Sequence, residues 1–184
     1  MDAMVLGLVL FFGVHVIPLL AGVRQALIGV LGRWVYLGLF ALASFAGLSL
    51  MWQGYQQIEV RILWPALAMG RGFAHALMPV ALILVVAAYL PTFIKHQVRH
   101  PMLIGVALWA AVHLLANGDL ASTLLFAPFL VYALLDMRLS RVRKTLIPVR
   151  KPGWLFDILA VIFGLMLYGA LLLGHGRLFG VAVL

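Results

Sequence analysis

Long apolar stretches separated by short polar connections dominate this sequence. A bilayer core about 30 Å thick needs roughly 20 apolar residues of helix to cross it. Stretches of this length or slightly shorter occupy six ranges: 3–21, 34–55, 73–90, 102–116, 120–136 and 155–174. We therefore predict an all-α integral membrane protein, a six-helix transmembrane bundle that forms one domain over residues 1–184.

The fourth and fifth predicted helices are short, and only Asn117, Gly118 and Asp119 separate them. Glycine suits a turn after a helix, and Asp119 can cap the helix that follows. We expect a short hairpin between these two helices, which either spans the bilayer or stops before the far surface.

The composition agrees with a membrane protein. Of the 184 residues, 66% are hydrophobic and 10% are charged, whereas roughly a quarter of the residues in soluble domains are charged. So few charged side chains cannot cover a water-soluble surface, which excludes a soluble enzyme and a disordered tail. The sequence has no cysteine, which excludes disulfide bonds, thiolate metal sites and iron–sulfur clusters.

Basic residues favour one face of the predicted bundle. Six spans put both termini on one side, and the connections on the other side carry ten basic residues: Arg24, Arg33, Lys95, Arg99, Arg138, Arg141, Arg143, Lys144, Arg150 and Lys151. The side of the termini carries three: Arg61, Arg71 and Arg177. By the positive-inside rule the richer face is cytoplasmic, so we predict a bacterial inner-membrane protein with both termini in the periplasm.

This placement also changes the meaning of the net charge of +8. The charge reflects membrane orientation, and we expect no nucleic-acid partner. The basic run at 138–151 is interpreted as a solvated loop beside the membrane, with an anionic-lipid or nucleic-acid patch as the alternative.

Three histidines lie inside predicted spans, where a polar side chain is costly unless it is paired or functional. These are His15, His75 and His113; the others, His96, His100 and His175, lie at loops or helix ends. Helical rise puts His15 roughly 18 Å from the outer surface and His113 roughly 16–18 Å from the inner surface. Both depths are close to the middle of the bilayer. The alternative is that each histidine bonds to a carbonyl of a neighbouring helix.

Histidines without other ligand types favour haem over a bare metal ion. A zinc or di-iron site needs three or four ligands, including carboxylates. The acidic residues all lie at membrane edges: Asp2, Glu59, Asp119, Asp136 and Asp157. Two axial imidazoles are enough for haem iron, so we predict His15 and His113 as the metal ligands, with His75 as the substitute.

Residues on the same helix faces are candidates for the haem pocket. Two sets are spaced four apart: Gly7, Phe11 and His15, and Gly105, Trp109, His113 and Asn117. A glycine two turns from a ligand leaves room for a flat ring, and close helix packing explains it at least as well.

Four further side chains have expected roles in this pocket. Trp109 is deep enough to line it, and Asn117 is placed to bond a propionate or to close the hairpin. Arg99 on the inner side or Arg71 on the outer side can pair with the propionates.

The segment 99–122 contains a long motif. It consists of Arg-His-Pro-Met-Leu-Ile-Gly at 99–105, Leu-Trp at 108–109 and His-Leu-Leu-Ala-Asn-Gly-Asp-Leu-Ala-Ser at 113–122. This motif resembles the signature of the NnrU family. The resemblance extends over most of the chain, through His15, Ala-Tyr-Leu-Pro at 88–91 and Asp136.

The resemblance implies a bacterial membrane protein associated with denitrification, in the handling of nitrite and nitric oxide. It also implies a domain shared with the 15-cis-zeta-carotene isomerase of plants and cyanobacteria, a haem b membrane enzyme with histidine axial ligands. The ligand positions of that enzyme match His113 and His15. A further histidine, implicated in its redox-dependent ligand exchange, is matched here by Tyr132, which counts against isomerase activity but not against haem binding.

Three functions follow in order. The first is a haem b-binding membrane protein of nitric oxide or nitrite metabolism, which works by redox change or by releasing one axial imidazole to a small ligand. The second is a haem-dependent cis-trans isomerase of a polyene lipid such as zeta-carotene. The third is a metal-free structural protein or a membrane methyltransferase dependent on S-adenosylmethionine. The methyltransferase is considered because 99–105 also resembles a motif of such enzymes, but their C-terminal acidic residues have no match after Asp157.

The expected partners are the lipid bilayer, a small gaseous or lipid ligand, and a second copy of the chain in a homodimer.

Overall fold

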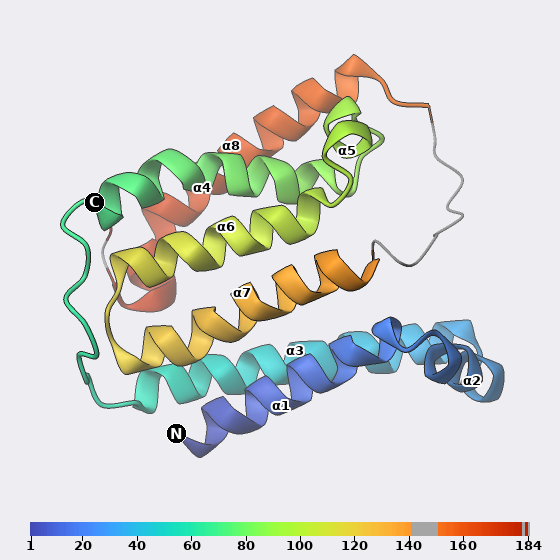
Figure 1. Cartoon of the computed structure of the whole chain (residues 1–184), viewed down its shortest axis with the longest axis horizontal. Helices are drawn as coiled ribbons and strands as arrows, with labels where there is room; N and C mark the ends of the chain where they lie inside the picture. The colour runs from blue at the N-terminus through green and yellow to red at the C-terminus, as the bar shows by residue number, and fades with distance from the viewer. Residues whose placement is uncertain (141–150, 182, 184) are drawn as a thin grey trace.

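The computed structural model describes residues 1–140, 151–181 and 183, which form helices joined by loops (Figure 1). The α-helices of these residues are α1 (Asp2–Val16), α2 (Ala21–Leu31), α3 (Arg33–Gln57), α4 (Gly70–Ala87), α5 (Phe93–Val98), α6 (Pro101–Ala116), α7 (Leu120–Ser140) and α8 (Trp154–Phe179). A 3-10 helix, η1 (Ile17–Leu19), follows α1. The described residues contain no β-strand beyond an isolated bridge between Ile62 and Asp119.

Within the described residues, five helices are long and apolar enough to cross a membrane. They are α1 together with η1, then α3, α4, most of α7, and α8. The remaining predicted span, 102–116, corresponds to α6, which is apolar but has 16 residues. That length gives about 24 Å of helix, less than a bilayer core of about 30 Å. The chain is therefore a multi-pass helical membrane protein, and the sixth predicted span is not confirmed.

Two segments that we predicted as connections are helical. α2 ends at Gly32, which has a φ of 78°, a backbone angle that glycine adopts at little cost. α5 is capped at its start by Thr92, whose hydroxyl accepts from the Lys95 amide at 2.9 Å. Hydropathy did not reveal these helices because each is shorter than a membrane span.

The helices pack in two groups (Figure 1). α1 lies along α3, and in the other group α4 lies between α6 and α8 while α7 packs on α6. α7 meets α1 and α3 at only a few residues. We call this boundary between the α1–α3 pair and α7 the α7 seam.

Glycines permit the closest helix pairs. A Cβ on Gly54 of α3 would overlap the backbone of Met4 on α1. On Gly7 it would lie 2.6 Å from the Met51 amide nitrogen, and on Gly105 it would lie 2.6 Å from the Ala81 carbonyl oxygen. The space beside Gly7 and Gly105 is therefore filled by neighbouring helices, so helix packing, rather than room for a flat ring, explains both glycines.

The short hairpin between α6 and α7 is present as predicted. The Asp119 carboxylate accepts from the Ser122 amide at 2.8 Å and so caps α7. Gly118 is buried, and its carbonyl accepts from the amides of Leu63 and Trp64 at 2.8 and 3.2 Å. A Cβ at Gly118 would overlap the Trp64 carbonyl, so this close approach is what requires glycine.

The two termini lie at one end of the bundle, and α2 and α5 lie at the other (Figure 1). We call the end with α2 and α5 the basic end and the opposite one the terminal end. The helix ends and connections at the basic end carry Arg24, Arg33, Lys95, Arg99, Arg138 and Lys151. Four further predicted bases of this face lie outside the described residues: Arg141, Arg143, Lys144 and Arg150.

Candidate functional site

His113 lies in the last turn of α6, near the terminal end. Its Nδ1 donates to the Trp109 carbonyl at 2.7 Å, because a carbonyl oxygen can only accept. The imidazole stacks on Phe126 of α7, with ring centroids 4.5 Å apart and an angle of 26° between the planes. The proton on Nδ1 leaves the lone pair on Nε2, the atom through which such an imidazole binds a metal.

His15 has the same local arrangement in the last turn of α1, near the basic end. Its Nδ1 donates to the Phe11 carbonyl at 2.7 Å. The ring stacks on Phe11 with centroids 4.0 Å apart and approaches Phe40 of α3 at 4.9 Å. The Tyr132 hydroxyl on α7 donates to the His15 carbonyl at 3.0 Å. This hydrogen bond links the backbone of α1 at His15 to α7 across the α7 seam.

A series of aromatic contacts joins the two histidines. Phe11 contacts Phe129 at 5.2 Å between centroids, Phe129 contacts Trp109 at 5.3 Å, and Trp109 contacts His113 at 5.6 Å. We call His15, Phe11, Phe129, Trp109 and His113 the aromatic chain. It crosses the α7 seam and connects α1 to α6.

The two imidazoles do not contact each other; other rings of the aromatic chain lie between them. On α7, Phe126 lies beside His113 and Tyr132 beside His15. Phe126 and Tyr132 are six positions apart on α7, which corresponds to about 9 Å of helical rise. The histidines are thus at different levels of the bundle, because α1 and α6 run in opposite directions and each histidine lies near its helix C-terminus.

The other candidate residues lie outside the aromatic chain, apart from Trp109. His75 is exposed on α4, and its Nδ1 is 3.1 Å from the Tyr168 hydroxyl of α8. Arg99 is exposed between α5 and α6 at the basic end, with a φ of 61°, and therefore lies at the end opposite His113. The side-chain amide of Asn117 donates to the His113 carbonyl at 2.9 Å, at the turn that links α6 to α7.

Sequence reasoning did not identify Phe126 and Phe129. Phe126 stacks on His113, and Phe129 contacts Phe11 and Trp109, the ring neighbours of the two histidines. With Tyr132, which contacts His15, they are spaced three apart on α7 and so share one face of that helix. This periodicity is visible in the sequence, but aromatic residues at such spacing are common in helix packing. Only the neighbouring helices reveal that this face meets both histidines.

The donor atoms of the site suit haem iron. Both imidazoles carry the Nδ1–H···O=C bond that fixes a metal-binding tautomer and ring orientation. Among the described residues, no three His, Cys, Asp or Glu side chains are grouped as they would be to hold a bare ion. The fit is one of donor chemistry, since aromatic rings fill the space between the two imidazoles.

The sequence was compared with models of known protein families. The family model described as NnrU protein matches residues 3–183, which include both histidines and the motif at 99–122. No curated protein and no solved structure matches the chain.

Proposed function

This chain belongs to the NnrU family, and on that premise we propose that it is a haem b-binding membrane protein of nitric oxide and nitrite metabolism. His15 and His113 are the residues that would hold the haem iron. The observation that carries the proposal is a hydrogen bond that each histidine makes within its own helix. In both, Nδ1 donates to the backbone carbonyl four residues earlier at 2.7 Å. Haem b would supply an iron that changes redox state and takes up a small ligand.

The chain's own residues would orient the ligands and exclude water. Phe11 and Phe126 stack on the two imidazoles and limit rotation of each ring. Tyr132 holds the backbone at His15 through its hydroxyl. Trp109 and Phe129 lie between the two histidines and keep this region apolar. Such surroundings favour a cofactor whose periphery is mostly hydrocarbon.

Binding one macrocycle to both imidazoles requires space that the aromatic rings now occupy. Carbon atoms in contact are about 3.5–4.0 Å apart, so a flat ring inserted between Phe11 and Phe129 would have to separate them by about that distance. The α7 seam, which these two side chains bridge, has few contacts. Parting these rings is not enough, because His15 and His113 lie at different levels of the bundle. The α1–α3 pair would also have to slide along α7 to bring both imidazoles to one iron.

The proposed setting is a bacterial inner membrane, with both termini on the periplasmic side. The position of the two termini at one end, opposite the basic end, supports this orientation. A small gaseous ligand is the proposed partner of the iron.

Absorption spectra of the detergent-purified protein, oxidised and reduced, test the haem proposal. After expression with ample haem, we expect a Soret band and sharp reduced α and β bands. His15→Ala and His113→Ala should each remove the bis-imidazole spectrum, and added imidazole should restore it in a variant that is still folded. His75→Ala is the matched control and should leave the spectrum unchanged, because His75 is exposed and bonded to Tyr168.

Each contrary result has a distinct meaning. A colourless protein that is folded and haem-supplied would overturn haem binding altogether. Loss of the spectrum in His75→Ala alone would show that the cofactor is right and the ligand pair is wrong.

A further inference from the structure

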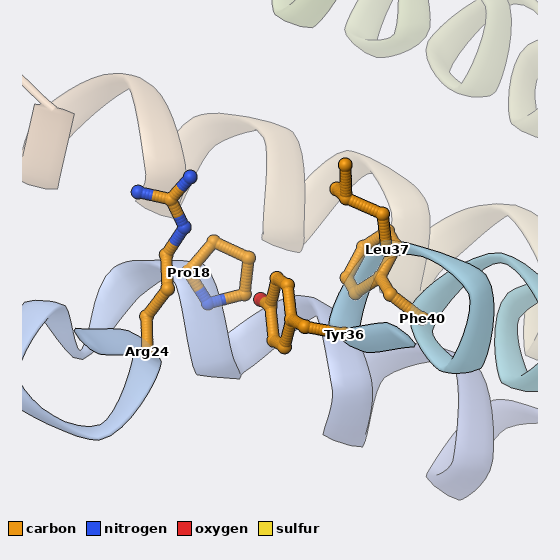
Figure 2. Close-up of a pocket in the computed structure, with 5 residues that line it drawn as sticks. All are labelled: Pro18, Arg24, Tyr36, Leu37 and Phe40. Atoms are coloured by element: carbon orange, nitrogen blue, oxygen red, sulfur yellow. The ribbon is translucent and has the colours of Figure 1, made fainter. Parts of the chain in front are cut away.

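A cavity of about 280 Å³ lies at the basic end, between η1, α2 and α3. It is lined by Pro18, Arg24, Tyr36, Leu37 and Phe40 (Figure 2). Small-molecule pockets usually measure about 300–1,000 Å³, so this cavity suits a head group rather than a large cofactor. None of the residues of the aromatic chain lines it, but it adjoins that chain, because its lining residue Phe40 contacts His15 at 4.9 Å between ring centroids.

Tyr36 supplies a polar group that its surroundings leave unsatisfied. The side chain is 6% exposed, and its buried hydroxyl has no hydrogen-bond partner within the described part of the chain. Figure 2 shows the hydroxyl directed toward Pro18, which lines the same cavity. A buried hydroxyl without a partner destabilises the fold, and a small movement of Pro18 that opens the hydroxyl to an acceptor bound in the cavity would recover this loss.

Arg24 supplies a positive charge on the other side of Pro18 (Figure 2). It is exposed on α2, and no described carboxylate forms an ion pair with it. The remaining wall, Pro18, Leu37 and Phe40, is apolar. A guanidinium and a phenol beside an apolar wall match an anionic oxygen group attached to a hydrocarbon chain.

The position of the cavity in the bundle narrows the choice of ligand. Tyr36 is three residues after the start of α3 at Arg33, about 5 Å of helical rise from the helix end. α2 is seen nearly end-on in Figure 1, whereas α1 and α3 are seen from the side, so α2 lies across the bundle end. Its exposed Val23, Val30 and Leu31 suit a helix that rests at the membrane surface. The cavity is therefore at the level of lipid head groups.

We propose that this cavity binds the phosphate group of an anionic membrane lipid. The Arg24 guanidinium and the Tyr36 hydroxyl donate to the phosphate oxygens, and the apolar wall contacts the first part of an acyl chain. Basic pockets between helices at a membrane surface recognise lipid head groups in this way. The bound lipid would fasten η1 to α2 and α3 next to His15.

Lipid binding to the full chain in neutral detergent tests the proposal, with phosphatidylglycerol as the probe and phosphatidylcholine as the neutral comparison. Native mass spectrometry measures bound lipid, and the rise of the thermal unfolding midpoint with lipid concentration gives the affinity. Arg24→Gln and Tyr36→Phe should each weaken phosphatidylglycerol binding about tenfold. Without lipid, Tyr36→Phe should be as stable as the parent or more so, because it removes an unsatisfied buried group.

Two matched variants control for charge and for the hydroxyl. Arg33→Gln removes a charge from the same end but outside the cavity lining, and Tyr89→Phe removes a hydroxyl from a side chain that is 75% exposed. Both should bind phosphatidylglycerol like the parent.

Other outcomes overturn the proposal. Equal effects of Arg24→Gln and Arg33→Gln would show a diffuse charge effect, and equal binding of phosphatidylcholine would exclude selection for an anionic lipid. Competition by millimolar inorganic phosphate alone would identify a soluble phosphate as the ligand. If Arg24→Gln or Tyr36→Phe changes the Soret band but leaves lipid binding unchanged, the cavity belongs to the haem site. Lipid binding is measured on protein without haem, so the lipid proposal and the haem proposal can fail separately.

Discussion

Individual polar side chains of this bundle are satisfied mainly by nearby backbone. His15 and His113 each bond to the carbonyl four residues earlier in their own helix, and Ser44 does the same with Phe40 at 2.7 Å. In an apolar environment such a carbonyl is the nearest acceptor. The two histidines therefore do not hold neighbouring helices together through these bonds, which was the alternative that their positions in the sequence left open.

A residue-scale prediction concerns Asp157 of α8. Its carboxylate accepts from the amides of Phe93 and Ile94, both at 3.0 Å, and so caps α5 from another helix. Asp157→Asn should weaken this cap and lower the free energy of unfolding by about 1 kcal/mol. Thermal unfolding in detergent measures the loss, and amide exchange should accelerate at Phe93 and Ile94.

Asp2→Asn is the control for this change. Asp2 is exposed in the first turn of α1, and we expect its substitution to alter stability much less. Unchanged exchange at α5 in Asp157→Asn would contradict a capping role.

Whole helices are paired by small residues on one side and by aromatic rings on the other. Gly7 and Gly54 bring α1 against α3, whereas Phe129 and Tyr132 of α7 reach across the α7 seam. Lipid provides no hydrophobic driving force for helix association, so helices in a membrane associate through close van der Waals packing. Glycines permit this packing because they let two backbones approach closely. The α1–α3 pair is consequently a tighter unit than its junction with α7.

Gly54→Val tests the packing of this helix pair. The added side chain would collide with the backbone of Met4, so α1 must move, at a cost of about 1–3 kcal/mol. Gly38→Val on the same helix is the matched control, because no atom lies within 4 Å of a Cβ there. It should be neutral or slightly stabilising, since valine is a better helix former than glycine. Equal unfolding midpoints for the two variants would refute the tight α1–α3 contact.

At the scale of the whole molecule, the sides of the bundle are apolar and its ends are polar. Large hydrophobic side chains are exposed along the spans, including Leu42, Phe45, Met166 and Leu173. In water such a surface would aggregate, whereas in a bilayer it contacts lipid. The separation of the basic end from the terminal end is the basis of the orientation proposed above.

The absence of native cysteine permits a clean test of this orientation. Glu59→Cys places a thiol in the loop at the terminal end, and Gln97→Cys places one on α5 at the basic end. In intact cells, a maleimide that crosses only the outer membrane should label the first variant and not the second. Both should react after the inner membrane is permeabilised, and labelling of Gln97→Cys in intact cells would reverse the proposed topology.

The sequence by itself determined the membrane class, most of the spanning helices, the hairpin at Gly118 and the family. These properties depend on hydropathy, turn residues and local motifs, each of which acts over a short stretch of chain. Spacing along single helices also placed Phe11 beside His15 and Trp109 beside His113.

Only the tertiary structure decided how these local sets meet. The direction and packing of α1, α6 and α7 put His15 and His113 at different levels, joined by Phe129, and turned His75 outward. Packing also filled the spaces beside Gly7 and Gly105, and it left the Tyr36 hydroxyl beside a cavity with no partner among the described residues. The reason is physical: apolar patterning specifies which helices enter the membrane, but contacts between distant segments specify which side chains share a site.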